Sequence, residues 1–145
     1  PQKVDGGYQV SIFIPPEYAK SARDAIVEQL EAHATDGVQV ELCHDQEANP
    51  LVAARTRRYA HLCIAPLMNY WATSRTSMGA MAQRVPLIVV GDHQDIEQPP
   101  GVAVVEDFEA LGPILTQCFA AWGEGNVAPL DPEAARAWLL ERVAR

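Results

Sequence analysis

The sequence predicts an α/β fold of three layers, in which helices cover both faces of a mostly parallel, five-stranded sheet. Two observations lead to this prediction. Short runs rich in valine, isoleucine and leucine alternate along the chain with longer segments whose apolar residues recur at helical spacing. The short runs are also apolar on both faces, which is typical of strands buried between two layers of helices. A chain of 145 residues, 48% of them hydrophobic, is long enough for one such core.

Each expected strand is a short apolar run that turn residues interrupt. Strands are predicted over residues 8–15, 38–43, 61–66, 85–90 and 102–105. The seven residues before the first strand are polar, and no structure is expected there. Right-handed crossovers between parallel strands favour a flavodoxin-like or Rossmann-like strand order.

The helices between these strands carry their own start signals. They are predicted over residues 17–33, from 49–50 to 59, from a cap at 73 or 74 to about 84, and from a cap at 107 to about 122. Asn49-Pro50 places a capping side chain before a proline in the first helical turn. Gly112-Pro113 should kink the fourth helix.

The last part of the chain is expected to stand apart from a domain over residues 1–122. Residues 123–130 (GEGNVAPL) have the composition of a linker. Asp131-Pro132 then starts a helix over residues 131–145 that carries large apolar side chains and no stop signal. We expect this helix to lead into a further domain, and packing back on the sheet domain is the alternative.

Charge is distributed unevenly along the chain. The net charge of −8 argues against nucleic acid or an anionic membrane as the partner. Residues 48–91 contain no Asp or Glu and carry +5, whereas the remainder of the chain carries −13. This segment is interpreted as a basic face that pairs with acidic neighbours, and a phosphate-binding site is the alternative. Its basic residues are Arg55, Arg57, Arg58, Arg75 and Arg84.

The three cysteines, Cys43, Cys63 and Cys118, lie in apolar runs, and none belongs to a Cys-x-x-Cys pair. This pattern is typical of reduced core thiols in a cytoplasmic protein. The four histidines show no metal-ligand spacing, so no metal site is predicted. No apolar run approaches the roughly 20 residues that a membrane-spanning helix needs.

Ligands of open parallel sheets bind beyond the carboxyl ends of the strands, so the loops at that edge hold the candidate ligand crevice. The loop after the third predicted strand is the most informative, because it leads into a helix N-terminus whose free N–H groups favour anions. Trp71 in this loop could stack on a base or a nicotinamide ring, and packing under the loop is the alternative. The candidates are Glu17, His44, Asp45, Asn69, Tyr70, Trp71, Ser74, Arg75, Asp92 and His93.

No standard catalytic motif accompanies this crevice. The segment after the first predicted strand, IPPEYAK, lacks the glycine of a phosphate-binding turn, and the sequence has no Gly-x-Ser-x-Gly elbow. The pairs His44-Asp45 and Asp92-His93 could meet across the crevice, but solvated loop residues would look the same. We therefore predict no catalytic residue and no cofactor, with NAD or another nucleotide as the alternative.

Three segments resemble TIR domains and, more loosely, the nucleoside deoxyribosyltransferase-like group. YQVSIFIPP is similar to the opening strand of TIR domains. HLCIAPLMNYWATSR resembles the TIR pattern in which an apolar strand leads to a tyrosine and then to a serine at a helix start. MGAMAQRVPLIVV resembles the helix and strand that follow. The resemblance covers residues 8 to about 105 and implies a TIR-like variant of the flavodoxin-like fold.

The resemblance fails at one position that matters for catalysis. Catalytic members of both groups carry a glutamate on the helix after strand three, and the alternative alignments place Gly79 or Ser77 there. Neither residue supplies the fixed negative charge that stabilises a developing ribosyl cation. A carboxylate that reaches in from a neighbouring loop, from Glu17, Asp45 or Glu47, is the alternative.

We therefore expect a non-catalytic, TIR-like domain that associates with itself or with other domains of the same polypeptide. It would belong to a larger bacterial signalling or defence-type protein in the cytoplasm. The resemblance implies assembly through residues 44–49 and the helix after strand three, with the arginines of the basic segment as interface residues. The alternative is a domain that binds or cleaves NAD or a cyclic nucleotide, where Asn69, Trp71 and Arg75 would hold the base and the phosphate.

Overall fold

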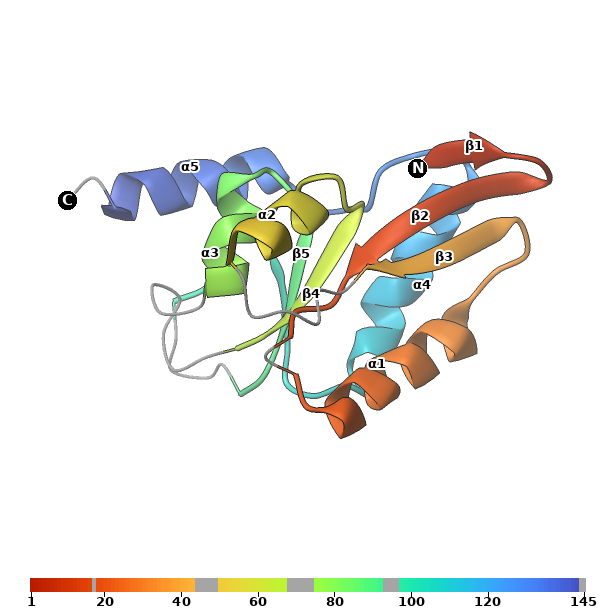
Figure 1. Cartoon of the computed structure of the whole chain (residues 1–145), viewed down its shortest axis with the longest axis horizontal. Helices are drawn as coiled ribbons and strands as arrows, with labels where there is room; N and C mark the ends of the chain where they lie inside the picture. The colour runs from red at the N-terminus through yellow and green to blue at the C-terminus, as the bar shows by residue number, and fades with distance from the viewer. Residues whose placement is uncertain (17, 44–49, 68–74, 93–96, 144–145) are drawn as a thin grey trace.

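The chain folds into three layers, with helices on both faces of a central sheet (Figure 1). The computed structural model describes residues 1–16, 18–43, 50–67, 75–92 and 97–143. Helices α1 (Lys20–His33) and α4 (Leu111–Gly123) pack on one face of the sheet. The other face is covered by α2 (Pro50–Arg58), α3 (Arg75–Ala82) and α5 (Pro132–Val143). The predicted α/β class is thereby confirmed.

The described part of the sheet has six strands, five of them parallel. They are β1 (Gln2–Val4), β2 (Gly7–Phe13), β3 (Val38–Cys43), β4 (Leu62–Pro66), β5 (Leu87–Val90) and β6 (Ala103–Val105). The parallel strands lie in the order β3-β2-β4-β5-β6, which is the flavodoxin-like order. β3 pairs along most of β2, whereas β4 pairs only with its last residues, Ile12 and Phe13.

Alternate residues of the central strands enter two separate cores. Ile64 and Ile88 pack with the layer of α1 and α4, while Cys63 and Leu87 pack with the opposite layer. Successive side chains of a strand point to opposite faces, so strands that are apolar at every position need helices on both sides. Each fully buried side chain of this kind contributes roughly 1.5–3 kcal/mol to folding.

The start of the chain is the main departure from the predicted fold. Residues 2–4 form the antiparallel strand β1, which pairs with the first half of β2 through a two-residue turn. Gly6 in this turn has φ 85°, a conformation that glycine adopts readily. The Asp5-Gly6 pair is a hairpin signal in the sequence, but the side chains of Gln2 and Lys3 are exposed and give no apolar pattern.

Several helix boundaries also differ from the prediction. α1 begins three residues late, at Lys20. The Asp107 carboxylate accepts a hydrogen bond from the Ala110 N–H at 2.9 Å, so it closes a turn before α4 and does not cap the helix itself. Gly112 and Pro113 consequently lie in the first turn of α4, where proline requires no kink.

The last helix packs on the sheet domain. Ala135 and Leu139 of α5 are buried in the core beside α3. The segment before α5 is also held in place, because Ala128 is 2% exposed and the Asp131 N–H donates to the Gly101 carbonyl. Within the described ranges, no helix is both long enough and apolar enough to cross a lipid bilayer.

Candidate functional site

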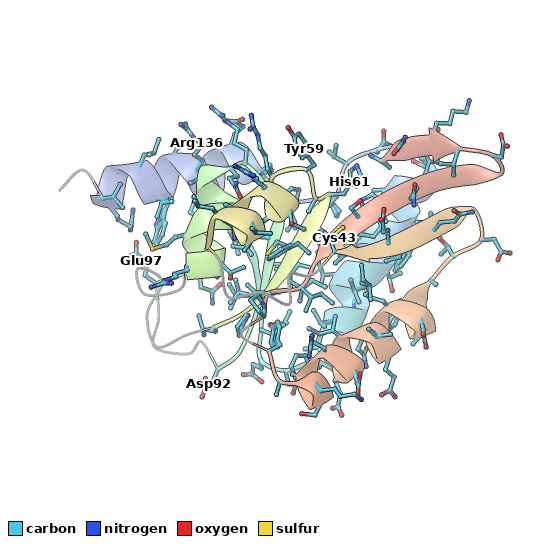
Figure 2. All side chains as sticks on the ribbon, in the orientation of Figure 1. Cys43, Tyr59, His61, Asp92, Glu97 and Arg136 are labelled. Atoms are coloured by element: carbon cyan, nitrogen blue, oxygen red, sulfur yellow. The ribbon has the colours of Figure 1, made fainter. Side chains whose placement is uncertain are left out.

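Most of the predicted ligand crevice falls outside the described residues. This is the case for Glu17, His44, Asp45, Asn69, Tyr70, Trp71, Ser74 and His93. The two other candidates are described and exposed: Arg75 is the first residue of α3, and Asp92 follows β5. Figure 2 places Asp92 at the carboxyl end of the sheet, as expected for a crevice residue. Nucleotide binding in this crevice stays a prediction.

Gly79, one of the two positions that align with the catalytic glutamate of the resembled families, lies against a buried arginine. A Cβ atom added at Gly79 would overlap the guanidinium group of Arg57, and Arg57 is only 7% exposed. Ser77, the other aligned position, is fully buried. The structure therefore has no acid at either position and holds a cation beside one of them. A positive charge there would oppose a ribosyl cation nearby, because like charges repel most strongly where water is excluded.

Arg57 is held in place by contacts with the turn after α3 and with β2. Its Nε donates a hydrogen bond to Gln83 Oε1 at 2.7 Å, and its guanidinium lies 5.7 Å from the ring centroid of Phe13. Gln83 Nε2 in turn donates to the Ala54 carbonyl at 2.9 Å. Arg57 thus joins α2 to the turn after α3, and burial removes it from the predicted set of surface interface residues.

The outward side of α2 combines exposed arginines with exposed apolar side chains. Leu51 is 71% exposed and Tyr59 is 76% exposed, and Tyr59 projects from the turn after α2 (Figure 2). The Arg58 guanidinium lies 5.5 Å from the Tyr59 ring centroid. We call this surface the α2 face; it consists of Leu51, Val52, Arg55, Arg58 and Tyr59. Its arginines are evident in the sequence, but its apolar part is not, because the exposure of Leu51 and Tyr59 leaves no mark in the sequence pattern.

Two acidic side chains lie on the other side of the molecule. Glu28 and Glu31 lie three residues apart on α1 and are exposed, so they form one stripe on that helix. We call this pair the α1 stripe. Because α1 and α2 cover opposite faces of the sheet, the α1 stripe and the α2 face lie on opposite sides of the domain (Figure 1).

Burial disfavours ionisation of two of the three cysteines, Cys43 and Cys118. All three are free thiols; Cys63 and Cys118 are buried as expected of core residues, whereas Cys43 is only partly buried. Burial raises the pKa of Cys118 to about 12. Burial also raises the pKa of Cys43, as does the negative charge of Glu41, and a hydrogen bond from Ser11 partly opposes this rise. A thiol must be ionised to attack, so neither group is reactive at neutral pH.

His61 immediately precedes β4 and is hydrogen-bonded to β2. Its N–H donates to the Ser11 carbonyl, and its ring Nδ1 accepts a hydrogen bond from the Ser11 N–H, both at 2.8 Å. An accepting Nδ1 carries no proton, so the neutral ring carries its proton on Nε2. Burial lowers the pKa of His61, and the positive Pro1 amino group adds to this.

A cavity of about 240 Å³ opens beside His61. It lies at the amino ends of β4 and β5, opposite the edge where the ligand crevice was predicted (Figure 2). Its lining comes from Pro1, residues 60–61, 84, 86 and 122, and the segment that leads into α5. This amino-end cavity leaves no signal in the sequence, because its parts are far apart in the chain and form no motif.

In comparisons with known proteins, no family model matches the chain and no curated protein is significantly similar to it. The TIR-like interpretation therefore depends on the three segments quoted above and on the strand order. The same strand order serves many unrelated functions.

Proposed function

We propose that this chain is a non-catalytic, TIR-like association domain whose α2 face docks onto the α1 stripe of a second copy. The observation that carries the proposal is the composition of the α2 face. Tyrosine and arginine are enriched at the energetic centres of protein interfaces, and Leu51 adds apolar area that water solvates poorly. No acid in residues 48–91 neutralises these arginines from within the segment.

Charge complementarity favours a second copy of the chain as the occupant. The α2 face is basic, whereas the chain as a whole is strongly acidic, so each copy carries both halves of an attractive contact. The two halves lie on opposite faces of the sheet. A contact between different surfaces does not close on itself after one step, so it produces chains or rings of copies.

The environment of Gly79 supports a non-catalytic role. Glycosyl transfer by the mechanism that the resemblance implies needs a carboxylate, and α3 has Gly79 beside the buried Arg57 instead. The domain would then act through assembly, as an interaction module of a larger bacterial signalling or defence-type protein in the cytoplasm.

Light scattering over a range of protein concentration and salt tests this function. The average mass should rise with concentration at low salt and fall towards that of a monomer near 1 M salt, where charges are screened beyond about 3 Å. Arg55→Glu should abolish the rise. Lys3→Glu, on the exposed strand β1, changes the net charge equally and should leave it intact.

Two results would overturn the proposal. One is a mass that stays monomeric at low salt and high protein concentration. The other is consumption of NAD by the purified chain, which would show that a carboxylate outside α3 completes a catalytic site.

A further inference from the structure

Trp122 brings an unsatisfied donor to the amino-end cavity. The residue lines the cavity and is fully buried at the end of α4. Its Nε1–H has no hydrogen-bond partner within the described part of the chain. Buried polar groups of native proteins are almost always paired, and an indole N–H can only donate. A molecule that occupies the cavity and offers an acceptor would satisfy it.

His61 also lines this cavity and carries a second donor. The Ser11 N–H already occupies Nδ1, so the ring proton lies on Nε2. That leaves the ring one donor and no free acceptor. The two rings therefore favour the same kind of ligand atom, an oxygen that accepts hydrogen bonds.

Arg84 adds a positive charge at the wall of the cavity, in an unusual backbone conformation. It has φ 58°, and it is the only non-glycine residue with positive φ among the described residues. The Val85 N–H donates to the Ala80 carbonyl and the Arg84 N–H to the Met81 carbonyl, which is the helix ending that normally places glycine at this position. A side chain kept in a conformation that favours glycine points to a role for that side chain.

The remaining walls are apolar. Pro86 precedes β5, and Val127, Ala128, Leu130 and Pro132 come from the segment before and at the start of α5. An engineered apolar cavity of about 150 Å³ binds benzene. At about 240 Å³, this cavity has room for a ring of that size together with a small polar group.

We infer that the amino-end cavity binds a small organic monocarboxylate with a compact apolar body. The carboxylate would contact Arg84 and accept hydrogen bonds from Trp122 Nε1 and His61 Nε2, while the apolar walls enclose the body. Glu133 on α5 already pairs with Arg84 at 2.7 Å, so the ligand would share this arginine with a carboxylate of the protein. The site does not involve the α2 face, so this inference is independent of self-association.

Titration with benzoate, followed through the indole N–H signals of the ¹⁵N-labelled chain, tests the inference. The Trp122 signal, assigned by its loss in Trp122→Phe, should shift downfield and saturate. The neutral amide of the same shape, benzamide, should bind roughly tenfold more weakly, because it forfeits the charge-assisted contacts. Absence of a saturating shift with benzoate up to tens of millimolar would overturn the inference, as would equal binding of benzamide.

Two variants of the Arg84–Glu133 pair have opposite expected effects. Arg84→Gly should weaken benzoate binding roughly tenfold without lowering the melting temperature, because glycine suits the positive φ. Glu133→Gln should strengthen binding, because it removes the competing carboxylate. Arg55→Ala, on the α2 face, is the control and should bind as the wild type does. Unchanged affinity in Arg84→Gly, or weaker binding in Glu133→Gln, would contradict the inference.

Discussion

Gly79 leaves the space that the Arg57 guanidinium occupies between α2 and α3. Helix propensity alone would make Gly79→Ala stabilising by up to about 1 kcal/mol. We predict the opposite sign, a loss of about 1–3 kcal/mol, because the new methyl group displaces a guanidinium that Gln83 and Phe13 hold in place. Urea denaturation of the two proteins measures the difference.

Substitution of Arg57, the residue packed against Gly79, provides an internal control for this prediction. In an Arg57→Ala background the space beside residue 79 is empty, so Gly79→Ala should no longer destabilise and should follow helix propensity. If Gly79→Ala costs the same free energy in both backgrounds, the guanidinium is not what excludes a side chain at this position.

His61 makes part of the stability depend on pH. Its pKa is lowered in the folded state, chiefly by burial, so the unfolded chain takes up the proton first as the pH falls. The stability that neutral His61 contributes to the fold is fully present above the pKa of about 6.5 that histidine has in the unfolded chain. This stability is lost as the pH falls from there through the lowered pKa of the folded state. We predict a decline in the free energy of unfolding below about pH 6.5, measured by urea denaturation at a series of pH values.

The variant His61→Gln separates this effect from that of the other titrating groups. A glutamine oxygen can still accept from the Ser11 N–H but does not titrate, so the decline should become shallower. An identical pH profile in the variant would remove His61 as the cause.

At the scale of elements, Asp131 shows how a local sequence signal fixes the position of a whole helix. Its Oδ1 accepts a hydrogen bond from the Ala134 N–H at 3.0 Å in the first turn of α5. Asp131→Ala should therefore lower the free energy of unfolding by about 1 kcal/mol, whereas Asp131→Asn, which keeps a capping oxygen, should lower it little. Equal losses in thermal or urea unfolding would show that charge at this position matters more than the cap.

The elements that sequence predicts well are those that a dense apolar pattern defines. β4 occupies residues 62–66, one residue shorter than the predicted 61–66, because four successive apolar residues are buried in it and its run ends at a proline. β1 was missed because its pairing is made by backbone groups while its side chains are exposed. The start of α4 was misplaced because the carboxylate of Asp107 can close a turn as readily as it can cap a helix.

At the scale of the whole molecule, sequence predicts charge but not cavities. The acid-free segment containing Arg55 and Arg58 is evident from the chain, because charge is a property of each residue. The amino-end cavity is not, because it depends on three side chains, His61, Arg84 and Trp122, which come from separate segments. Burial of Arg57 also depends on tertiary packing and could not be read from its neighbours in sequence.

The proposed assembly follows from the separation of charge across the sheet. The α2 face and the α1 stripe lie on opposite sides, so in the proposed assembly each copy would dock through one basic and one acidic surface. Two variants can each lose one surface while keeping the other: Arg55→Ala/Arg58→Ala removes the basic one, and Glu28→Gln/Glu31→Gln removes the acidic one.

Sedimentation velocity on these two variants, separately and mixed, tests the central claim most directly. Each variant alone should sediment as a monomer at low salt, because it lacks one half of the contact. A mixture should form one-to-one dimers and nothing larger, because the intact α1 stripe of the first variant meets the intact α2 face of the second and no further copy can add. A mixture that stays monomeric, or a single variant that still assembles as the wild type does, would contradict the claim.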